Sequence, residues 1–251
     1  MKPISLQLYT LRERASADFI DVLKKVADIG YKGVEPAGIF GHEPTEIRKV
    51  VEDLGMTVSS NHQPWPSLDN LNEVVDVAAG LGTDIVICGY GPDDFTDIEK
   101  IKKTAETTNT IVEKLNADGL IVALHNHYWE FDTIDGKLKY DVFVEMCPNL
   151  TCEVDTYWSA NFGAVDPVQV VSKYKAKAPL LHIKDGPLVK DELLNPIGAG
   201  KMDIPAVIAA ADESVLRWLI VELDNCDRDM LQAVTESYSY LTGEGLAQGN
   251  K

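Results

Sequence analysis

The sequence predicts an α/β protein whose residues 1–243 form a single-domain (β/α)8 TIM barrel. Three observations lead to this prediction. A helix-to-strand boundary of one form recurs along the chain, several strands are continuous apolar runs, and no linker interrupts the pattern. Continuous apolar runs such as "DIVIC" and "LIVAL" are typical of a parallel sheet that is buried on both faces. The chain has 251 residues, 45% of them hydrophobic, which suffices for one barrel with a sizeable core.

The recurring boundary consists of a helical pattern, a glycine and a short β-branched run. It occurs in "ADIGYKGVEP", "EDLGMTVSS", "GLGTDIVIC" and "NADGLIVAL". Its glycines are Gly30, Gly55, Gly82 and Gly119, each where a helix C-terminus needs a left-handed residue. Apolar residues three and four apart precede each glycine, which indicates an amphipathic helix.

These boundaries place eight strands and eight helices along the chain. The strands are expected near 4–9, 33–36, 57–61, 84–88, 120–125, 150–155, 179–184 and 218–223. The helices are expected near 16–29, 44–54, 67–80, 97–117, 140–146, 166–176, 203–211 and 228–242. Thr96 with Glu99 has the form of a capping box, and Asp166 followed by Pro167 suits a helix start. Residues 244–251 are polar and glycine-containing, and we expect a flexible tail.

A doubly wound open sheet is the alternative fold. Such a sheet usually carries a glycine-rich phosphate-binding turn after its first strand. Here that turn is "YTLRERASADF", and no GxGxxG or P-loop motif occurs in the chain. The barrel is therefore the preferred prediction.

Composition excludes several classes of partner. The formal net charge is −17 and the pI is near 4.6, so the surface would repel nucleic acid and anionic membranes. The four cysteines form no CxxC pair, and we expect reduced thiols in a cytoplasmic protein. The N-terminal "MKPISLQLYTL" has no signal-peptide pattern. A small-molecule substrate is the expected partner, and a homo-oligomer stays open.

Polar side chains gather at the predicted carboxyl ends of the strands, where the active sites of such barrels lie. In chain order they are Gln7, Tyr9, Glu35, Asn61, His62, His125, His127, Glu130, Glu153, Asp155, His182, Lys184, Asp185, Glu222 and Asp224. Carboxylates and an imidazole that converge from consecutive strands would repel one another without a cation. The later strands therefore predict one divalent metal ion, for which Mn²⁺, Co²⁺, Mg²⁺ or Zn²⁺ are candidates.

Four motifs, "HNHYWEF", "EVDTYW", "HIKD" and "IVELD", follow in this order at strand-end spacing. With them the whole chain resembles the xylose isomerase-like TIM barrel superfamily, in particular its sugar phosphate isomerase/epimerase group. The resemblance implies one divalent metal held by a Glu, an Asp, a His and a second Glu. Asp155, His182 and Glu222 match the last three. For the first ligand we favour Glu130, with a direct histidine ligand such as His125 as the alternative.

The resemblance also implies a sugar isomerase or epimerase. The metal would polarise the substrate carbonyl, and a base would remove the adjacent carbon-bound proton to give an enediolate. Glu222 is the favoured base, and His127 or Lys184 the complementary acid. Glu35, His62, His125, Trp65 and Trp158 are expected to contact the substrate. His125 and His127 should line the site, while Trp129 or Phe131 turns into the packing.

Three other functions remain as alternatives. A metal-dependent dehydratase or lyase on a keto-inositol or 3-keto-sugar would use the same enolate chemistry. An AP-endonuclease would need three metals, more histidines than the five present and a basic groove, all disfavoured by this composition. A non-catalytic sugar-binding module conflicts with the intact Asp155, His182 and Glu222 set. No Arg or Lys cluster in the loops demands a phosphate, which favours an unphosphorylated sugar or polyol.

Overall fold

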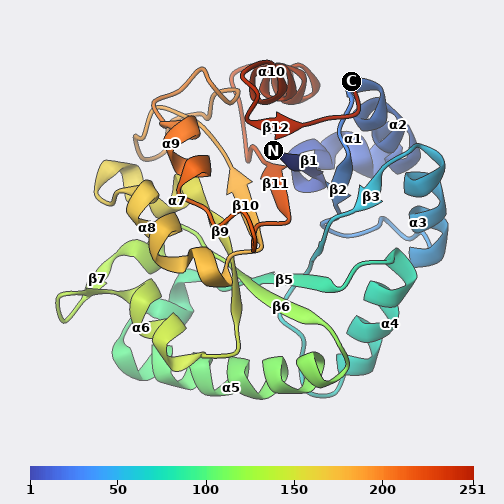
Figure 1. Ribbon diagram of the computed structural model, residues 1–251. Coiled ribbons are helices and arrows are strands. Elements are labelled where there is room, and N and C mark those ends of the chain that lie inside the picture. The colour runs from blue at the N-terminus through green and yellow to red at the C-terminus, as the bar shows by residue number, and fades with distance from the viewer.

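The computed structural model describes residues 1–251 and confirms the barrel. The nine barrel strands are β1 (Lys2–Gln7), β2 (Gly33–Glu35), β3 (Thr57–Val58), β4 (Asn61–His62), β5 (Ile85–Gly89), β6 (Ile121–His125), β9 (Thr151–Asp155), β10 (Leu180–Ile183) and β11 (Trp218–Val221). They are parallel throughout, in the order β3-β2-β1-β11-β10-β9-β6-β5-β4. Helices surround these strands (Figure 1).

The barrel closes through its third strand, which is split into β3 and β4. Thr57–Val58 pairs with β2, whereas Asn61–His62 pairs with β5. An isolated bridge between Ala37 and His62 joins the two edges. Nine short strands therefore occupy the eight strand positions that the sequence predicts.

Ten α-helices are present. They are α1 (Arg12–Ala17), α2 (Phe19–Ile29), α3 (Pro44–Asp53), α4 (Leu71–Leu81), α5 (Ile98–Ala117), α6 (Lys139–Met146), α7 (Thr156–Ser159), α8 (Pro167–Tyr174), α9 (Ile204–Ala209) and α10 (Met230–Gly243). Short 3-10 helices occupy Leu8–Leu11, Pro92–Phe95, Trp129–Phe131, Asn161–Gly163 and Lys175–Lys177. None of the helices is long and apolar enough to cross a membrane.

Local sequence explains most helix ends. The four boundary glycines, Gly30, Gly55, Gly82 and Gly119, all have positive φ, as predicted. The Asp166 side chain caps α8 and Pro167 is its first residue, also as predicted. The predicted capping box on Thr96 is wrong. Asp97 caps α5 instead, because its carboxylate accepts hydrogen bonds from the Glu99 and Lys100 backbone amides.

Two further local predictions differ from the structure. The predicted helix 16–29 is interrupted at Asp18, whose extended backbone ends α1 and whose side chain caps α2. A small hairpin, β7 (Thr133–Ile134) with β8 (Lys137–Leu138), was not predicted. Its turn is Asp135–Gly136, both with positive φ, and this Asp-Gly pair is the signal that could have revealed it.

Residues 244–251 make more contacts than a flexible tail would. β12 (Ala247–Gln248) pairs with β1, so the C-terminal segment lies beside the N-terminus (Figure 1). The Asn250 side chain donates hydrogen bonds to the carbonyls of Tyr31 and Gly55. The start of β1 thus supplies hydrogen-bond partners to a C-terminal segment whose composition alone predicts no ordered structure.

The barrel strands have two different buried faces. Outward side chains such as Leu124, Val154, Leu181 and Val221 join the large core between the sheet and the helices. Inward side chains at the amino ends of the strands form a separate apolar cluster, namely Ile85, Ile87, Ala123, Leu180 and Ile220. Because side chains alternate along a strand, the next inward positions are two residues further on. Those positions carry the site.

Candidate metal centre

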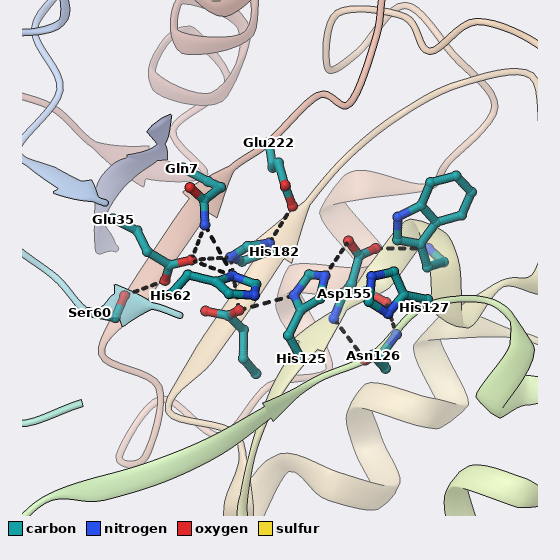
Figure 2. A network of polar contacts seen from close by, with 12 residues as sticks. Gln7, Glu35, Ser60, His62, His125, Asn126, His127, Asp155, His182 and Glu222 are labelled. Carbon is teal, nitrogen blue, oxygen red and sulfur yellow. Dashed lines mark hydrogen bonds and ion pairs between the residues drawn. The ribbon is translucent and has the colours of Figure 1, made fainter. Parts of the chain in front are cut away.

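The inward positions at the carboxyl ends of four strands bring together four ionisable side chains. His125 ends β6, Asp155 ends β9, His182 lies on β10, and Glu222 follows β11 directly. One nitrogen or oxygen of each lies within 4.8 Å of those of the others, and all four residues are buried. Figure 2 shows that they point toward one another from their separate strands. The predicted convergence of Asp155, His182 and Glu222 is therefore present.

The atoms of this cluster lie at ligand-to-ligand spacing. His182 Nδ1 is 2.7 Å from Glu222 Oε2, and His125 Nε2 is 4.0 Å from Asp155 Oδ2. Asp155 Oδ1 accepts a hydrogen bond from the Trp158 backbone amide, and the buried Oδ2 is paired with Lys184 Nζ at 3.0 Å. Two imidazole nitrogens and two carboxylate oxygens at this spacing form a donor set that suits a divalent cation.

Glu130 does not join this cluster, although we favoured it as the first ligand. The chain leaves β6 at His125 and turns into the 3-10 helix Trp129–Phe131. This turn folds Glu130 back, so that its Oε2 accepts a hydrogen bond from the His127 backbone amide. Burial raises the pKa of the Glu130 carboxyl. The structure places His125, the alternative that we had considered, beside Asp155, His182 and Glu222.

His127 and the aromatic residues after it behave as predicted in part. The His127 side chain is partly exposed, and its ring stacks on Trp129 with centroids 4.1 Å apart. Phe131 is 1% exposed and packs into the core. His125 is 3% exposed and lies inside the barrel. Both histidines therefore stay on the site side, while Phe131 turns into the packing.

Lys184 is a buried cation beside the cluster. Its Nζ lies 3.0 Å from Asp155 Oδ2, 2.9 Å from Glu222 Oε2 and 2.8 Å from Asp224 Oδ2. Burial alone would lower the pKa of Lys184, but the three carboxylates outweigh it and raise the pKa well above its usual value. The ammonium is therefore charged, and it donates hydrogen bonds at the mouth of the barrel.

A second group of polar residues lies on the other side of His182. Glu35 Oε1 is 3.1 Å from His182 Nε2 and 3.5 Å from His62 Nδ1. The side chains of Gln7 and Ser60 also donate hydrogen bonds to Glu35 (Figure 2). Burial would raise the pKa of Glu35, but the neighbouring His182 and His62 lower it below its usual value. Glu35 is fully buried, whereas the neighbouring His62 is partly exposed.

Glu153 is a site residue for which the sequence alone indicates no role. It lies two positions before Asp155 on β9, which places both side chains on the same inward face. Its Oε2 is 3.1 Å from His125 Nδ1 and 3.1 Å from His182 Nε2. Burial and the negative charge of Glu35 raise the pKa of Glu153 well above its usual value. The "EVD" spacing was the signal that could have identified it.

The pKa values of the two histidines of the cluster are shifted in opposite directions. Burial and the neighbouring charge of His182 lower the pKa of His125. Burial would also lower the pKa of His182, but the negative charges of Glu153, Glu35 and Glu222 raise it well above its usual value. Without a cation, His182 therefore holds a proton that a divalent metal would displace.

The two predicted tryptophan contacts have different positions. The Trp158 ring lies 5.3 Å from Lys184 Nζ, so it borders the site. Trp65, which follows β4 in the chain, stacks on Tyr90 with ring centroids 4.6 Å apart. Both indoles are partly exposed.

Comparison with known proteins agrees with this architecture. Residues 23–242 match the family model of the xylose isomerase-like TIM barrel, and the chain belongs to this family. A search of curated proteins found no match. A sugar phosphate isomerase/epimerase from Parabacteroides distasonis is 25% identical, with a TM-score of 0.81 over 98% of this chain and 96% of that one.

Two more distant structures share the fold. The probable 3-DHS dehydratase AsbF of Bacillus anthracis is 15% identical, with a TM-score of 0.74 over 96% of this chain and 99% of that one. The IOLI protein, whose structure has a zinc atom bound, is 14% identical, with a TM-score of 0.75 over 98% of each chain. The fold thus occurs in isomerase/epimerase and dehydratase neighbours, and the buried His/Asp/Glu cluster could bind a metal.

Proposed function

We propose that the protein is a divalent-metal-dependent sugar isomerase or epimerase that removes a proton next to a carbonyl through an enediolate. The observation that carries the proposal is the buried convergence of His125, Asp155, His182 and Glu222 at the mouth of the barrel. The isomerase/epimerase from Parabacteroides distasonis supports the reaction class. An unphosphorylated sugar or polyol is the proposed substrate.

The cluster has the donor set of a catalytic metal site. His125, Asp155, His182 and Glu222 would supply two nitrogens and two oxygens, which suits Zn²⁺, Mn²⁺ or Co²⁺ better than the all-oxygen preference of Mg²⁺. Asp155 Oδ2 faces the cluster, 4.0 Å from His125 Nε2 and 3.0 Å from Lys184 Nζ. When bound, such an ion acts as a Lewis acid that polarises the carbonyl and stabilises the negative charge of the enediolate.

Side chains of the protein would supply the base, the acid and the substrate contacts. Glu222 is ionised, because Lys184 and His182 lower the pKa of its carboxyl against the effect of burial, and it is the proposed base. Lys184 donates hydrogen bonds to the developing oxyanion, and His127 is the second candidate acid. Trp158 and Trp65 would bind a sugar ring face, and His62 a hydroxyl.

Hydrogen exchange tests the reaction. The wild-type protein should incorporate deuterium from D₂O next to the carbonyl of at least one sugar in a panel of aldoses, ketoses and inososes, as measured by NMR. Elemental analysis of the same preparation should find about one divalent ion per chain. Absence of exchange across the panel by metal-loaded protein would contradict the enediolate mechanism.

Metal affinity decides between His125 and Glu130 as the first ligand. We expect His125→Ala to lose high-affinity Zn²⁺ binding, because it removes a member of the cluster. Glu130→Gln should bind Zn²⁺ like the wild type, because the glutamine carbonyl can still accept the His127 amide hydrogen bond. Competition with a chromophoric chelator measures both, and the opposite pattern would restore Glu130 as the ligand.

A metal-dependent dehydratase or lyase acting on a keto-inositol or 3-keto-sugar is the second candidate. The observation in its favour is Lys184, a buried cation beside the cluster that could stabilise the negative charge on a leaving hydroxyl. The dehydratase AsbF shares the fold. Release of water or an aglycone together with deuterium exchange would identify this reaction rather than epimerisation.

A further inference from the structure

One carboxylate oxygen lies between the two histidines of the cluster. Glu153 Oε2 is 3.1 Å from Nδ1 of His125 and 3.1 Å from Nε2 of His182. The contact with His125 is a hydrogen bond, whereas the contact with His182 is an ion pair, because the hydrogen bond of His182 Nε2 goes to Glu35 Oε1. Glu153 is 0% exposed, so water does not compete for either contact.

The opposite nitrogen of each ring faces the cluster. His125 Nε2 points to Asp155, and His182 Nδ1 points to Glu222 (Figure 2). Each imidazole thus has one nitrogen for Glu153 and one for a cation. A neutral imidazole carries its proton on only one nitrogen, and the other provides the lone pair.

Strand pairing explains how one side chain reaches both rings. Glu153 is directly opposite His125 in the β6–β9 ladder, and His182 is opposite Asp155 in the β9–β10 ladder. Glu153 therefore lies one inward position closer to the amino end of β9 than Asp155. From there it approaches both histidines on the side away from the barrel mouth.

We propose that Glu153 is a positioning residue that fixes the tautomers of both histidine ligands. It holds the proton on Nδ1 of His125 and, together with Glu35, the proton on Nε2 of His182. His125 Nε2 and His182 Nδ1 are then free to bind the cation. This inference rests on the proposed metal site. A carboxylate that accepts a hydrogen bond from a metal-binding histidine typically contributes 10–100-fold to metal affinity.

Glu35 provides a matched control. Its Oε1 also lies 3.1 Å from His182 Nε2, but its hydrogen bonds, to Gln7, Ser60 and His182, include none to His125. Glu35→Gln removes a buried carboxylate of the same kind from the same network. It therefore tests whether any loss of charge there has the effect assigned to Glu153.

The first test is ¹⁵N NMR of the histidine side chains in metal-free wild-type protein. We expect His125 as the Nδ1–H tautomer, which is uncommon in free histidine. The spectra are recorded near pH 8, above the ordinary histidine pKa of about 6.5, where a neutral ring shows its tautomer. In Zn²⁺-loaded protein His182 should be the Nε2–H tautomer. His125 as the Nε2–H tautomer in the wild type would overturn the proposal.

The second test compares the two glutamine variants. Glu153→Gln should lower Zn²⁺ affinity by about 10–100-fold and change the His125 tautomer, because an amide can accept from one imidazole but donates to the other. Glu35→Gln should leave the His125 tautomer unchanged. Wild-type Zn²⁺ affinity in folded Glu153→Gln, or an equal His125 change in Glu35→Gln, would refute the assignment.

The outcomes also separate this inference from the proposed function. A wild-type protein that binds no divalent metal contradicts the proposed function, whereas the metal-free His125 tautomer still reports on Glu153. Binding of two Zn²⁺ per wild-type chain and one per Glu153→Gln chain would make Glu153 a ligand. That result would overturn the positioning role and leave the metal dependence intact.

Discussion

The two faces of the barrel strands are equally buried but chemically opposite at the mouth. Val154, Leu181 and Val221 face the helices, while Asp155 and His182 face the barrel axis, and all are 0% exposed. The outward side chains stabilise the fold by removing apolar area from water. The inward side chains carry buried charges, which cost stability unless a partner compensates them. Burial alone therefore does not distinguish structural positions from functional ones.

The largest expected effect is on catalysis, at the inward face. Glu222→Gln should lower deuterium exchange at the carbon next to the carbonyl by at least ~10²-fold, because it removes the proposed base. NMR of the substrate in D₂O measures the rate, with the metal content of the variant determined alongside. Exchange at the wild-type rate in metal-loaded Glu222→Gln would remove Glu222 from this role.

The next effect is on stability, at the outward face. Leu181→Ala should lower the free energy of unfolding by about 2–5 kcal/mol, since it leaves a cavity between β10 and the helices. Urea denaturation followed by circular dichroism measures the change. Zn²⁺ affinity should remain near that of the wild type, and a large loss of affinity would show that the two faces are not independent.

Metal-dependent stability should belong to the inward face alone. At 100 times its dissociation constant, a ligand stabilises the folded state by about 2.7 kcal/mol, or very roughly 5–10 °C in Tm for a chain of this size. Asp155→Asn should lose this Zn²⁺-induced increase, whereas Leu181→Ala should keep it. Thermal scans with and without Zn²⁺ provide the measurement, and a full Zn²⁺ response in Asp155→Asn would exclude Asp155 as a ligand.

The smallest effect is a pH dependence at the outward face. Burial raises the pKa of the Cys152 thiol to about 11. The folded state therefore binds the thiol proton more tightly than the unfolded state does. The stabilisation of the folded state by this proton is complete below the unfolded pKa of about 9, and it is lost as the pH rises to 11. Cys152→Ala should flatten the fall in stability between pH 9 and 11 relative to the wild type. An unchanged slope would contradict the prediction.

Much of the fold and part of the site could be predicted because they depend on local rules. Glycines with positive φ end four helices, and alternation along β9, β10 and β11 sends Asp155, His182 and Glu222 to one face. The family resemblance assigned these three to a metal. Thr96 was the wrong cap because the adjacent Asp97 offers a carboxylate to two amides.

The sequence by itself determined the order of the strands, the positions of the helices and the three strand-end residues, because periods of two and 3.6 residues act over short distances. Only the tertiary structure placed His125 rather than Glu130 beside the other three residues, since the direction of a side chain after a strand depends on how the chain turns. The tertiary structure also brought Glu153 into contact with His125 and His182. Those contacts join residues 28 and 29 positions apart, and only pairing of β6, β9 and β10 brings them within hydrogen-bond distance.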